Sequence, residues 1–244
     1  MTPSRSIVVP CYNEARNLPN LVARFRALRG RIDGDPWELV LVDNGSTDGS
    51  GDILRDLAAA EGPWLRVVTV TPPNVGYGHG IVTGLRAARG EWLAWTHADG
   101  QTPPADTLAA LDLLATSPDP RRTFVKGRRR GRALRDALFT AGMQAAALAL
   151  LGESLPDINA QPKAFHRDLL ALADRPPVDL SLDLYLFFTA RRHGFAVRTL
   201  DVHFGAREHG ESKWAFNWRS KARNIARTLT FMRALRQGDG WRSA

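Results

Sequence analysis

The sequence predicts an α/β protein whose sheet is mostly parallel and flanked by helices. Up to about residue 115, short apolar runs alternate with longer amphipathic stretches. Strands separated by helices in this way form βαβ units, and the strands of such units run parallel. The chain has 244 residues, of which 44% are hydrophobic and 24% charged, and this suits one domain with a sizeable core.

The first half of the chain predicts four strands and four helices in alternation. Strands are expected at 7–9, 37–42, 65–70 and 91–95, and helices at 15–28, from about 48, at 78–89 and from 103 to about 114. Gly90 is suited to end the third helix. Pro103 and Pro104 are suited to open the fourth, because proline is tolerated in the first turn.

The second half is less regular. Strands are expected at 123–126 and 195–204, helices at 133–151, 180–192 and 214–236, and irregular chain at 156–165. No linker separates two domains. We therefore expect one domain over residues 1–212, followed by a basic amphipathic C-terminal helix and tail over 213–244.

Composition also bounds the environment of the protein. A single cysteine, Cys11, excludes an intramolecular disulfide and fits a reducing cytosol. The first expected strand begins so early that no signal peptide is expected. The longest near-apolar stretch, 137–151, is shorter than the roughly 20 residues of a bilayer-spanning helix, so no transmembrane segment is expected.

The positive charge is concentrated in two stretches. The net charge is +8, yet residues 121–135 hold eight Lys and Arg with no acid, and residues 205–244 hold nine with three acids. The remainder of the chain is therefore acidic. Basic patches of this kind attract nucleic acid, anionic lipid or a phosphorylated substrate.

A polar loop follows each of the first four expected strands. The loops cover residues 10–14, 43–48, 74–78 and 97–101. In a parallel α/β sheet the loops at the carboxyl ends of the strands converge on one edge, where ligands bind. These four loops therefore predict a ligand site.

In these loops the chain resembles the GT-A glycosyltransferases of family 2, and among them the dolichol-phosphate mannose synthase-like branch. The matching segments are VVPCYNEARNL, LVLVDNGSTDGS, NVGYGHGIVTGLRAARGEW and THADGQTPP, in that order, and DINAQPKAFHRDLL and VHFGAREHGESKW match more loosely. The resemblance implies a GT-A fold. It also implies an inverting transfer of a hexose from a donor such as GDP-mannose or UDP-glucose to a dolichyl or undecaprenyl phosphate.

Seven residues are expected to contact the nucleotide-sugar donor: Pro10, Tyr12, Glu14, Asp43, Gly76, Asp99 and Gln101. An aromatic ring can stack on a base, and the carboxylates of Glu14 and Asp43 can accept hydrogen bonds from base or ribose. Glu14 and Asp48 could instead be helix caps, and for Asp48 that interpretation is favoured. The glycine run that begins at Gly76 lacks the dinucleotide fingerprint and suits a tight turn.

Asp99 is the strongest candidate in the catalytic set. A divalent cation, Mg²⁺ or Mn²⁺, bridging the diphosphate would neutralise charge on the leaving group. Its expected ligands are Asp99 and the amide oxygen of Gln101. The resembled family usually has a second acid where this chain has His97. His97 could ligate Mn²⁺, contact the donor phosphates or cap the strand.

The basic stretch after the fifth expected strand is expected to bind the acceptor. Eight cations without an acid repel one another unless an anion offsets the charge. The resemblance implies that arginines here hold a lipid phosphate, with Arg129 and Arg135 as the closest matches and Arg128 and Arg132 beside them. Two later residues, Arg207 and Lys213, are matched to further phosphate contacts.

Asp157 and Asp183 are candidate general bases. A hydroxyl acceptor on a glycan, lipid or small molecule would need such a base. A phosphate acceptor is already ionised and would not. The acceptor class therefore decides whether these carboxylates are catalytic.

The C-terminal helix has an apolar stripe beside a basic one. The stripe consists of Trp218, Ala222, Ile225, Leu229 and Met232. Such a helix suits a membrane interface, which predicts a cytoplasmic protein peripheral to the inner face of a membrane. The alternative is a helix packed on the domain or in a homo-oligomer.

One further function stays open, and another is disfavoured. Because His97 replaces an acid, the chain could be a non-catalytic nucleotide-sugar- or lipid-binding protein. No nucleic-acid partner is expected, since the basic sequence carries no recognition motif.

Overall fold

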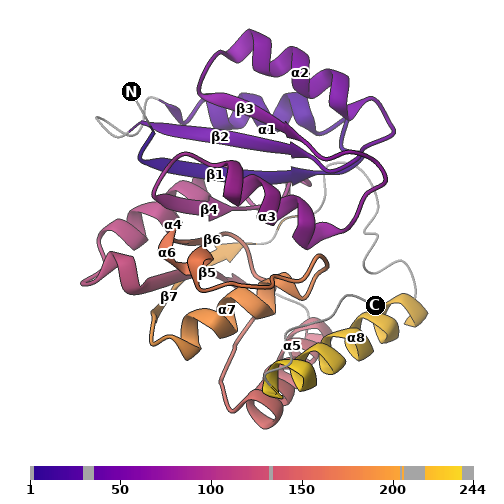
Figure 1. Ribbon diagram of the computed structural model, residues 1–244, viewed down its shortest axis with the longest axis vertical. Coiled ribbons are helices and arrows are strands. Elements are labelled where there is room, and N and C mark those ends of the chain that lie inside the picture. Colours follow the sequence, from indigo (N-terminus) through magenta and orange to yellow (C-terminus); the bar gives the residue numbers. More distant parts are fainter. Residues whose placement is uncertain (1–2, 30–35, 132–133, 204, 206–217, 238–244) are drawn as a thin grey trace.

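The computed structural model describes residues 3–29, 36–131, 134–203, 205 and 218–237, with the side chains of 134–139 and 218–221 excepted. In this part of the chain, seven strands form one sheet in the order β3-β2-β1-β4-β6-β5-β7 (Figure 1). The strands are β1 (Arg5–Cys11), β2 (Trp37–Asp43), β3 (Leu65–Thr69), β4 (Trp92–Trp95), β5 (Thr123–Arg130), β6 (Lys163–His166) and β7 (Ala196–His203).

Among the strands of the described residues, only β6 runs against its neighbours. It pairs antiparallel with both β4 and β5, whereas β1, β2, β3 and β4 pair parallel with one another and β5 pairs parallel with β7. Because two antiparallel steps separate β4 from β5, these strands run in the same direction. The carboxyl end of β5 therefore lies at the same sheet edge as the first four polar loops.

Helices cover both faces of the sheet. They are α1 (Leu18–Arg26), α2 (Ser50–Glu61), α3 (Tyr77–Ala87), α4 (Pro104–Ala115), α5 (Leu134–Leu151), α6 (Asp168–Ala171), α7 (Leu182–Arg192) and α8 (Trp218–Arg236), with a 3-10 turn η2 (Pro120–Arg122). Alternate residues of each strand face opposite cores. In β1, Ile7 packs in the core that holds Leu18 of α1, and Val8 packs in the core that holds Ile81 of α3.

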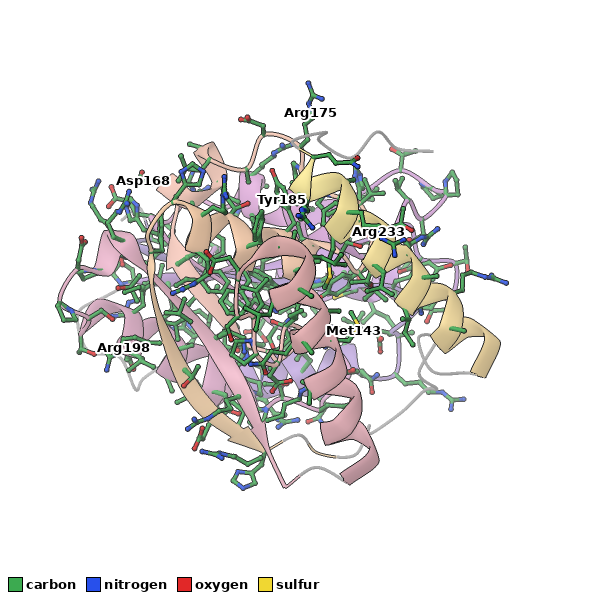
Figure 2. The ribbon with its side chains drawn as sticks, turned by 90° about the horizontal axis from the view of Figure 1, so that it is seen from below. Met143, Asp168, Arg175, Tyr185, Arg198 and Arg233 are labelled. Carbon is green, nitrogen blue, oxygen red and sulfur yellow. The ribbon has the colours of Figure 1, made fainter. Side chains whose placement is uncertain are left out.

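The last helix packs on the protein. Helices α5 and α8 contact each other at the β5 side of the molecule (Figures 1 and 2). Phe231 and Met232 of α8 are buried, and the ring of Phe231 lies 6.2 Å from that of Tyr185 in α7. Met232 belongs to the apolar stripe expected at a membrane, so this end of the stripe faces the protein core.

The expected mostly parallel α/β fold with a C-terminal helix is confirmed. The irregular chain expected over 156–165 was wrong at its end, because β6 begins at Lys163. This strand is short and contains buried Lys163 and His166, so its sequence shows no apolar run; pairing with β4 and β5 makes it a strand. The expected domain boundary at 212 lies outside the described residues.

Candidate active site

The loops after β1 and β2 are bonded to each other at the carboxyl edge of the sheet. The N–H of Asn13 donates to Ser46 Oγ at 3.1 Å, and the N–H of Thr47 donates to Asn13 Oδ1 at 2.8 Å. The N–H of Glu14 donates to Ser50 Oγ at 2.9 Å. Side-chain oxygens thus accept hydrogen bonds from backbone N–H groups of the neighbouring loop. These bonds fix the position of the two loops relative to each other.

Asp48 also links the same two loops by hydrogen bonds. Its carboxylate accepts hydrogen bonds from the N–H of Ala15 at 3.2 Å and of Ser50 at 3.0 Å. Burial acts to raise the pKa of Asp48, but the hydrogen bonds from Ser50 and Ala15 outweigh it and hold the pKa below its usual value. Asp48 therefore accepts the first N–H of α2, but the N-cap position predicted for it is occupied by Gly49.

The expected donor contacts of the first two loops lie at this edge. Asp43 ends β2 and is buried, and its Oδ1 accepts the N–H of Ser46 at 3.0 Å. Pro10 lies one residue before the end of β1, and Tyr12 is half-buried in the loop that follows. The sequence-predicted donor residues of β1 and β2 are therefore brought together.

Gly76 serves a tight turn, as the sequence suggests. Its φ is +145°, and an added Cβ would collide with the carbonyl of Val178; at Gly78 a Cβ would collide with the carbonyl of Pro177. The side-chain amide of Asn44 donates to the Gly76 carbonyl at 2.9 Å. These glycines let the start of α3 approach the chain before α7.

Asp99 and Gln101 lie in the loop after β4. Asp99 is only 4% exposed, and its Oδ1 accepts the N–H of Gln101 at 3.2 Å. Gln101 also makes two bonds with Gly205, accepting its N–H at 3.0 Å and donating from Nε2 to its carbonyl at 3.1 Å. The loop is thus joined to the segment that follows β7.

His97 contacts the start of α3 through Nε2. Its Nε2 lies 2.9 Å from the hydroxyl of Tyr77, the first residue of α3. The two rings meet edge to face at a centroid distance of 5.6 Å. Metal ligation through Nε2 would have to replace this contact.

At the carboxyl end of β5, Arg129 forms a close ion pair with Asp157. Asp157 Oδ2 accepts the backbone N–H of Arg129 at 2.8 Å, and Oδ1 accepts Nε at 2.9 Å and also Nη2. Burial acts to raise the pKa of Asp157, but the bonds from Arg129 prevail and the pKa is lowered. The carboxylate of Asp157 is therefore an ion-pair partner, which opposes its expected role as a base.

Asp183 is buried in a second pair. Its Oδ1 accepts Lys163 Nζ and, at 2.9 Å, the side-chain amide of Gln161. Lys163 and Gln161 are fully buried. A carboxylate enclosed in this way is poorly placed to take a proton from a hydroxyl substrate.

Lys126 is a buried cation that the sequence analysis did not single out. It lies opposite Lys163 in the β5–β6 register, and its Nζ donates to the carbonyl of Gly127 at 2.7 Å. Burial first, and then the charge of Lys163, lowers the pKa of Lys126 from an ordinary 10.5 to about 7.

The remaining acceptor candidates are only partly described. Arg128 is exposed and forms an ion pair with Asp201, which Arg130 shares. Arg132, Arg207, Lys213 and the side chain of Arg135 lie outside the described residues.

A family model described as glycosyl transferase family 2 matches residues 6–171, which include this edge of the sheet. The chain belongs to glycosyltransferase family 2. The resemblance inferred from the four loop motifs is therefore confirmed.

Several curated relatives of this chain share the name undecaprenyl-phosphate 4-deoxy-4-formamido-L-arabinose transferase. The protein of that name from Pseudomonas fluorescens is 31% identical over 86% of this chain and 60% of its own length. The one from Aeromonas hydrophila is 29% identical over 86% of this chain and 62% of its own length. The chain thus spans about three fifths of these relatives.

Solved structures share the fold. Glucosyl-3-phosphoglycerate synthase from Mycobacterium tuberculosis, in complex with Mn²⁺, UDP and glucosyl-3-phosphoglycerate, aligns with a TM-score of 0.70 and 23% identity. The alignment covers 97% of this chain and 80% of that one. The glycosyltransferase therefore has the GT-A fold.

The loops after β1, β2 and β4 supply few cation ligands of their own. Among the described residues, no group of three or more His, Cys, Asp and Glu side chains could hold a metal ion. Asp99 and the amide oxygen of Gln101 are hard donors of the kind that Mg²⁺ and Mn²⁺ accept. This set fits a cation that takes most of its remaining ligands from substrate phosphates and water.

Some residues that support the site were not predicted from the sequence. Tyr77, Gln161 and Lys163 contact the predicted residues His97 and Asp183. The available signal was the placement of Gln161 and Lys163 beside apolar residues in the segment expected to be irregular.

Proposed function

We propose that the chain is a metal-dependent, inverting hexosyltransferase that moves sugar from a nucleotide diphosphate to a polyprenyl phosphate at a membrane surface. Family membership supports glycosyl transfer. The names of the curated relatives support a polyprenyl-phosphate acceptor.

The observation that carries the acceptor assignment is the pairing of both candidate bases. Asp157 is held by Arg129, and Asp183 is held by Lys163 and Gln161. A general base must bind the proton it removes, and the lowered pKa of Asp157 disfavours this. A phosphate acceptor needs no base, because it is ionised at neutral pH.

The donor is proposed to bind across the loops after β1, β2 and β4. Glu14 and Asp43 would accept hydrogen bonds from base or ribose, and Tyr12 would stack on the base. Asp99 and Gln101 would hold Mg²⁺ or Mn²⁺ beside the diphosphate. When bound, the cation would supply neutralisation of the negative charge on the leaving nucleotide.

The acceptor phosphate is proposed to bind at the carboxyl end of β5. Arg129 would contact it while Asp157 fixes the orientation of the guanidinium, and Arg128 lies on the same strand end. We propose that Arg132, Arg135, Arg207 and Lys213 add further phosphate contacts. The phosphate oxygen would displace the nucleotide from the opposite face of the anomeric carbon, which inverts its configuration.

Membrane contact is proposed to centre on α5 and α8. Residues Ala141, Ala145, Leu148 and Ala149 make one exposed, uncharged face of α5, and Leu148 is 56% exposed. Figure 2 looks onto α5 and α8, with Arg233 on α8; the exposed arginines of that helix also include Arg223, Arg227 and Arg236. An apolar face beside cations suits a surface of anionic lipid. Among the described residues, no helix is long and apolar enough to cross a bilayer.

A matched pair of acceptors tests the proposal. Purified protein with Mn²⁺ is given labelled GDP- and UDP-hexoses, and UDP-pentoses because the relatives are named for a substituted arabinose. Each donor is tested with undecaprenyl phosphate and with undecaprenol. We expect labelled lipid only with the phosphate. Transfer to the alcohol would favour a hydroxyl acceptor, and donor binding without transfer, independent of metal and of Asp99, would favour a non-catalytic binding protein.

A further inference from the structure

Five charged side chains lie together where β5, β6 and α7 meet. Lys126 and Arg129 belong to β5, Lys163 belongs to β6, Asp183 belongs to α7, and Asp157 precedes β6. The charges of the other four residues all act on Lys126, and none of the five side chains is more than 15% exposed. Because three cations share this space with two carboxylates, the cluster carries one positive charge in excess.

Lys126 is the cation of this cluster that has no carboxylate at contact distance. Arg129 and Lys163 each pair with an aspartate, whereas no ion pair among the described residues includes Lys126. Its Nζ donates to the carbonyl of Gly127 at 2.7 Å and lies 5.6 Å from the centre of the Phe187 ring. A carbonyl and a ring offset only part of the cost of burying an ammonium ion. With its pKa lowered to about 7, Lys126 is only partly protonated at neutral pH.

The cluster reaches the surface at the carboxyl end of β5, where the acceptor phosphate is proposed to bind. The Arg129 side chain is 15% exposed, whereas Lys126 is 1% exposed, and the residue opposite Lys126 on β7 is the uncharged Thr199. An anion can therefore contact Arg129 and act on Lys126 through space, where water screens the charges weakly. An opposite charge nearby raises the pKa of an ammonium group by about one to three units.

We propose that Lys126 is a specificity-determining residue, which takes up a proton when a phosphate monoester binds at Arg129 and thereby favours a dianionic acceptor. This role rests on the proposed function, because it requires the acceptor phosphate at the carboxyl end of β5. A phosphate monoester carries close to two negative charges above pH 7. The glycosylated diester keeps one of them, and an alcohol has none. Lys126 therefore holds the acceptor more strongly than the product.

Titration calorimetry tests the proton uptake without any sugar transfer. The full chain is titrated at pH 8 with farnesyl phosphate, a short polyprenyl phosphate, in two buffers that differ in their enthalpy of ionisation. The phosphate is already a dianion at this pH, so a proton taken up from the buffer goes to the protein. We expect an uptake of about 0.5–1 proton for each ligand bound. Binding without proton uptake, or no binding to the folded protein, would overturn the proposal.

Substitutions show which residue takes up the proton. Between pH 7.5 and pH 9 the Kd of farnesyl phosphate should rise about three- to tenfold in the wild type, because Lys126 must be protonated first. Lys126→Met removes a buried charge and should fold, with a weaker Kd that is constant over this range. The matched control is Arg198→Met on β7, whose guanidinium donates to the Leu113 carbonyl and Ser117 Oγ of the α4 side (Figure 2). This control should keep the wild-type slope. A wild-type slope in Lys126→Met would overturn the proposal.

A series of ligands tests the preference for a dianion. The methyl ester of farnesyl phosphate carries one charge and farnesol none, so proton uptake should decrease from the phosphate to its ester and vanish with farnesol. Equal uptake with the phosphate and the ester would contradict the preference. Transfer to undecaprenyl phosphate together with pH-independent binding would refute the role of Lys126 and leave the proposed function intact. Proton-coupled binding without transfer would count against the proposed function alone.

Discussion

The two halves of the sheet hold the polar residues at its carboxyl edge in different ways. In the β1–β4 half, side chains such as Asp48 and Asn13 bond to backbone N–H groups of neighbouring loops. In the β5–β7 half, charged side chains bond mainly to one another, as Arg129 does to Asp157 and Lys163 to Asp183. The first half positions loops, and the second half holds charges.

This difference implies different roles for the carboxylates of the two halves. Asp99 lies in a loop held by its backbone, where a carboxylate can serve a cation. Asp157 and Asp183 are bound to cations of the protein itself and serve to orient them. Charges that orient one another inside a protein are strongly coupled, so removing one partner should affect stability as well as binding.

Asp99→Asn should have the largest effect. We expect transfer to fall about 10²- to 10³-fold, because one group that stabilises leaving-group charge is lost. The free energy of unfolding measured in urea should change little. The matched control is Asp112→Asn on α4, whose exposed carboxylate pairs with Arg5. A fully active Asp99→Asn protein would remove the main distinction between the halves.

Arg129→Ala should come next, because it leaves Asp157 as an uncompensated, mostly buried charge. The free energy of unfolding should fall by about 2–3 kcal/mol, below the range for fully buried pairs because this pair is partly exposed. Arg128→Ala, which breaks an exposed pair with Asp201, should cost less than about 1 kcal/mol. Urea denaturation at pH 7 measures both. Equal losses of unfolding free energy in the two variants would show that the two ion pairs are equally coupled.

Lys126→Met should change how stability depends on pH. Between about pH 7 and the ordinary lysine pKa of 10.5, the unfolded wild type holds a proton at Lys126 that the folded protein has released. Wild-type stability from this residue therefore rises with pH across that range. Lys126→Met should be more stable than wild type by about 1–3 kcal/mol at pH 6. The advantage should shrink by pH 9.5; a constant difference would contradict the lowered pKa.

The smallest effect is expected at the surface of α5. Leu148→Asp should weaken binding to anionic vesicles about fivefold, because roughly one kcal/mol of apolar burial is lost. Val75→Asp is the matched control, since Val75 is 51% exposed and lies in the other half of the molecule. Vesicle co-sedimentation distinguishes them. Equal effects of the two variants would remove α5 as the membrane contact.

The β1–β4 half could be predicted closely from sequence. Its strands alternate with helices, and its site residues follow the strands directly, so local pattern and parallel topology place them. The tight turn at Gly76 and the brace at Asp48 were also recognisable, because each rests on a short-range rule.

The β5–β7 half could not be predicted to the same depth. Strand β6 runs against its neighbours and contains Lys163, whose burial depends on Asp183 from a distant helix. Contacts between residues that are far apart in the sequence produce no periodic pattern in the sequence. For the same reason the sequence indicates Asp157 and Asp183 as candidate bases, although each carboxylate has a cation of the protein as its partner.

The role of Asp157 is the most direct test of the phosphate-acceptor account. Transfer to undecaprenyl phosphate is measured for wild type and Asp157→Asn at saturating donor over a range of acceptor concentrations. The account predicts a kcat within about threefold of wild type and an acceptor KM raised about tenfold, because the substitution only loosens Arg129. A kcat lowered by about 10³-fold with an unchanged KM would show that Asp157 is a catalytic base and would contradict the account.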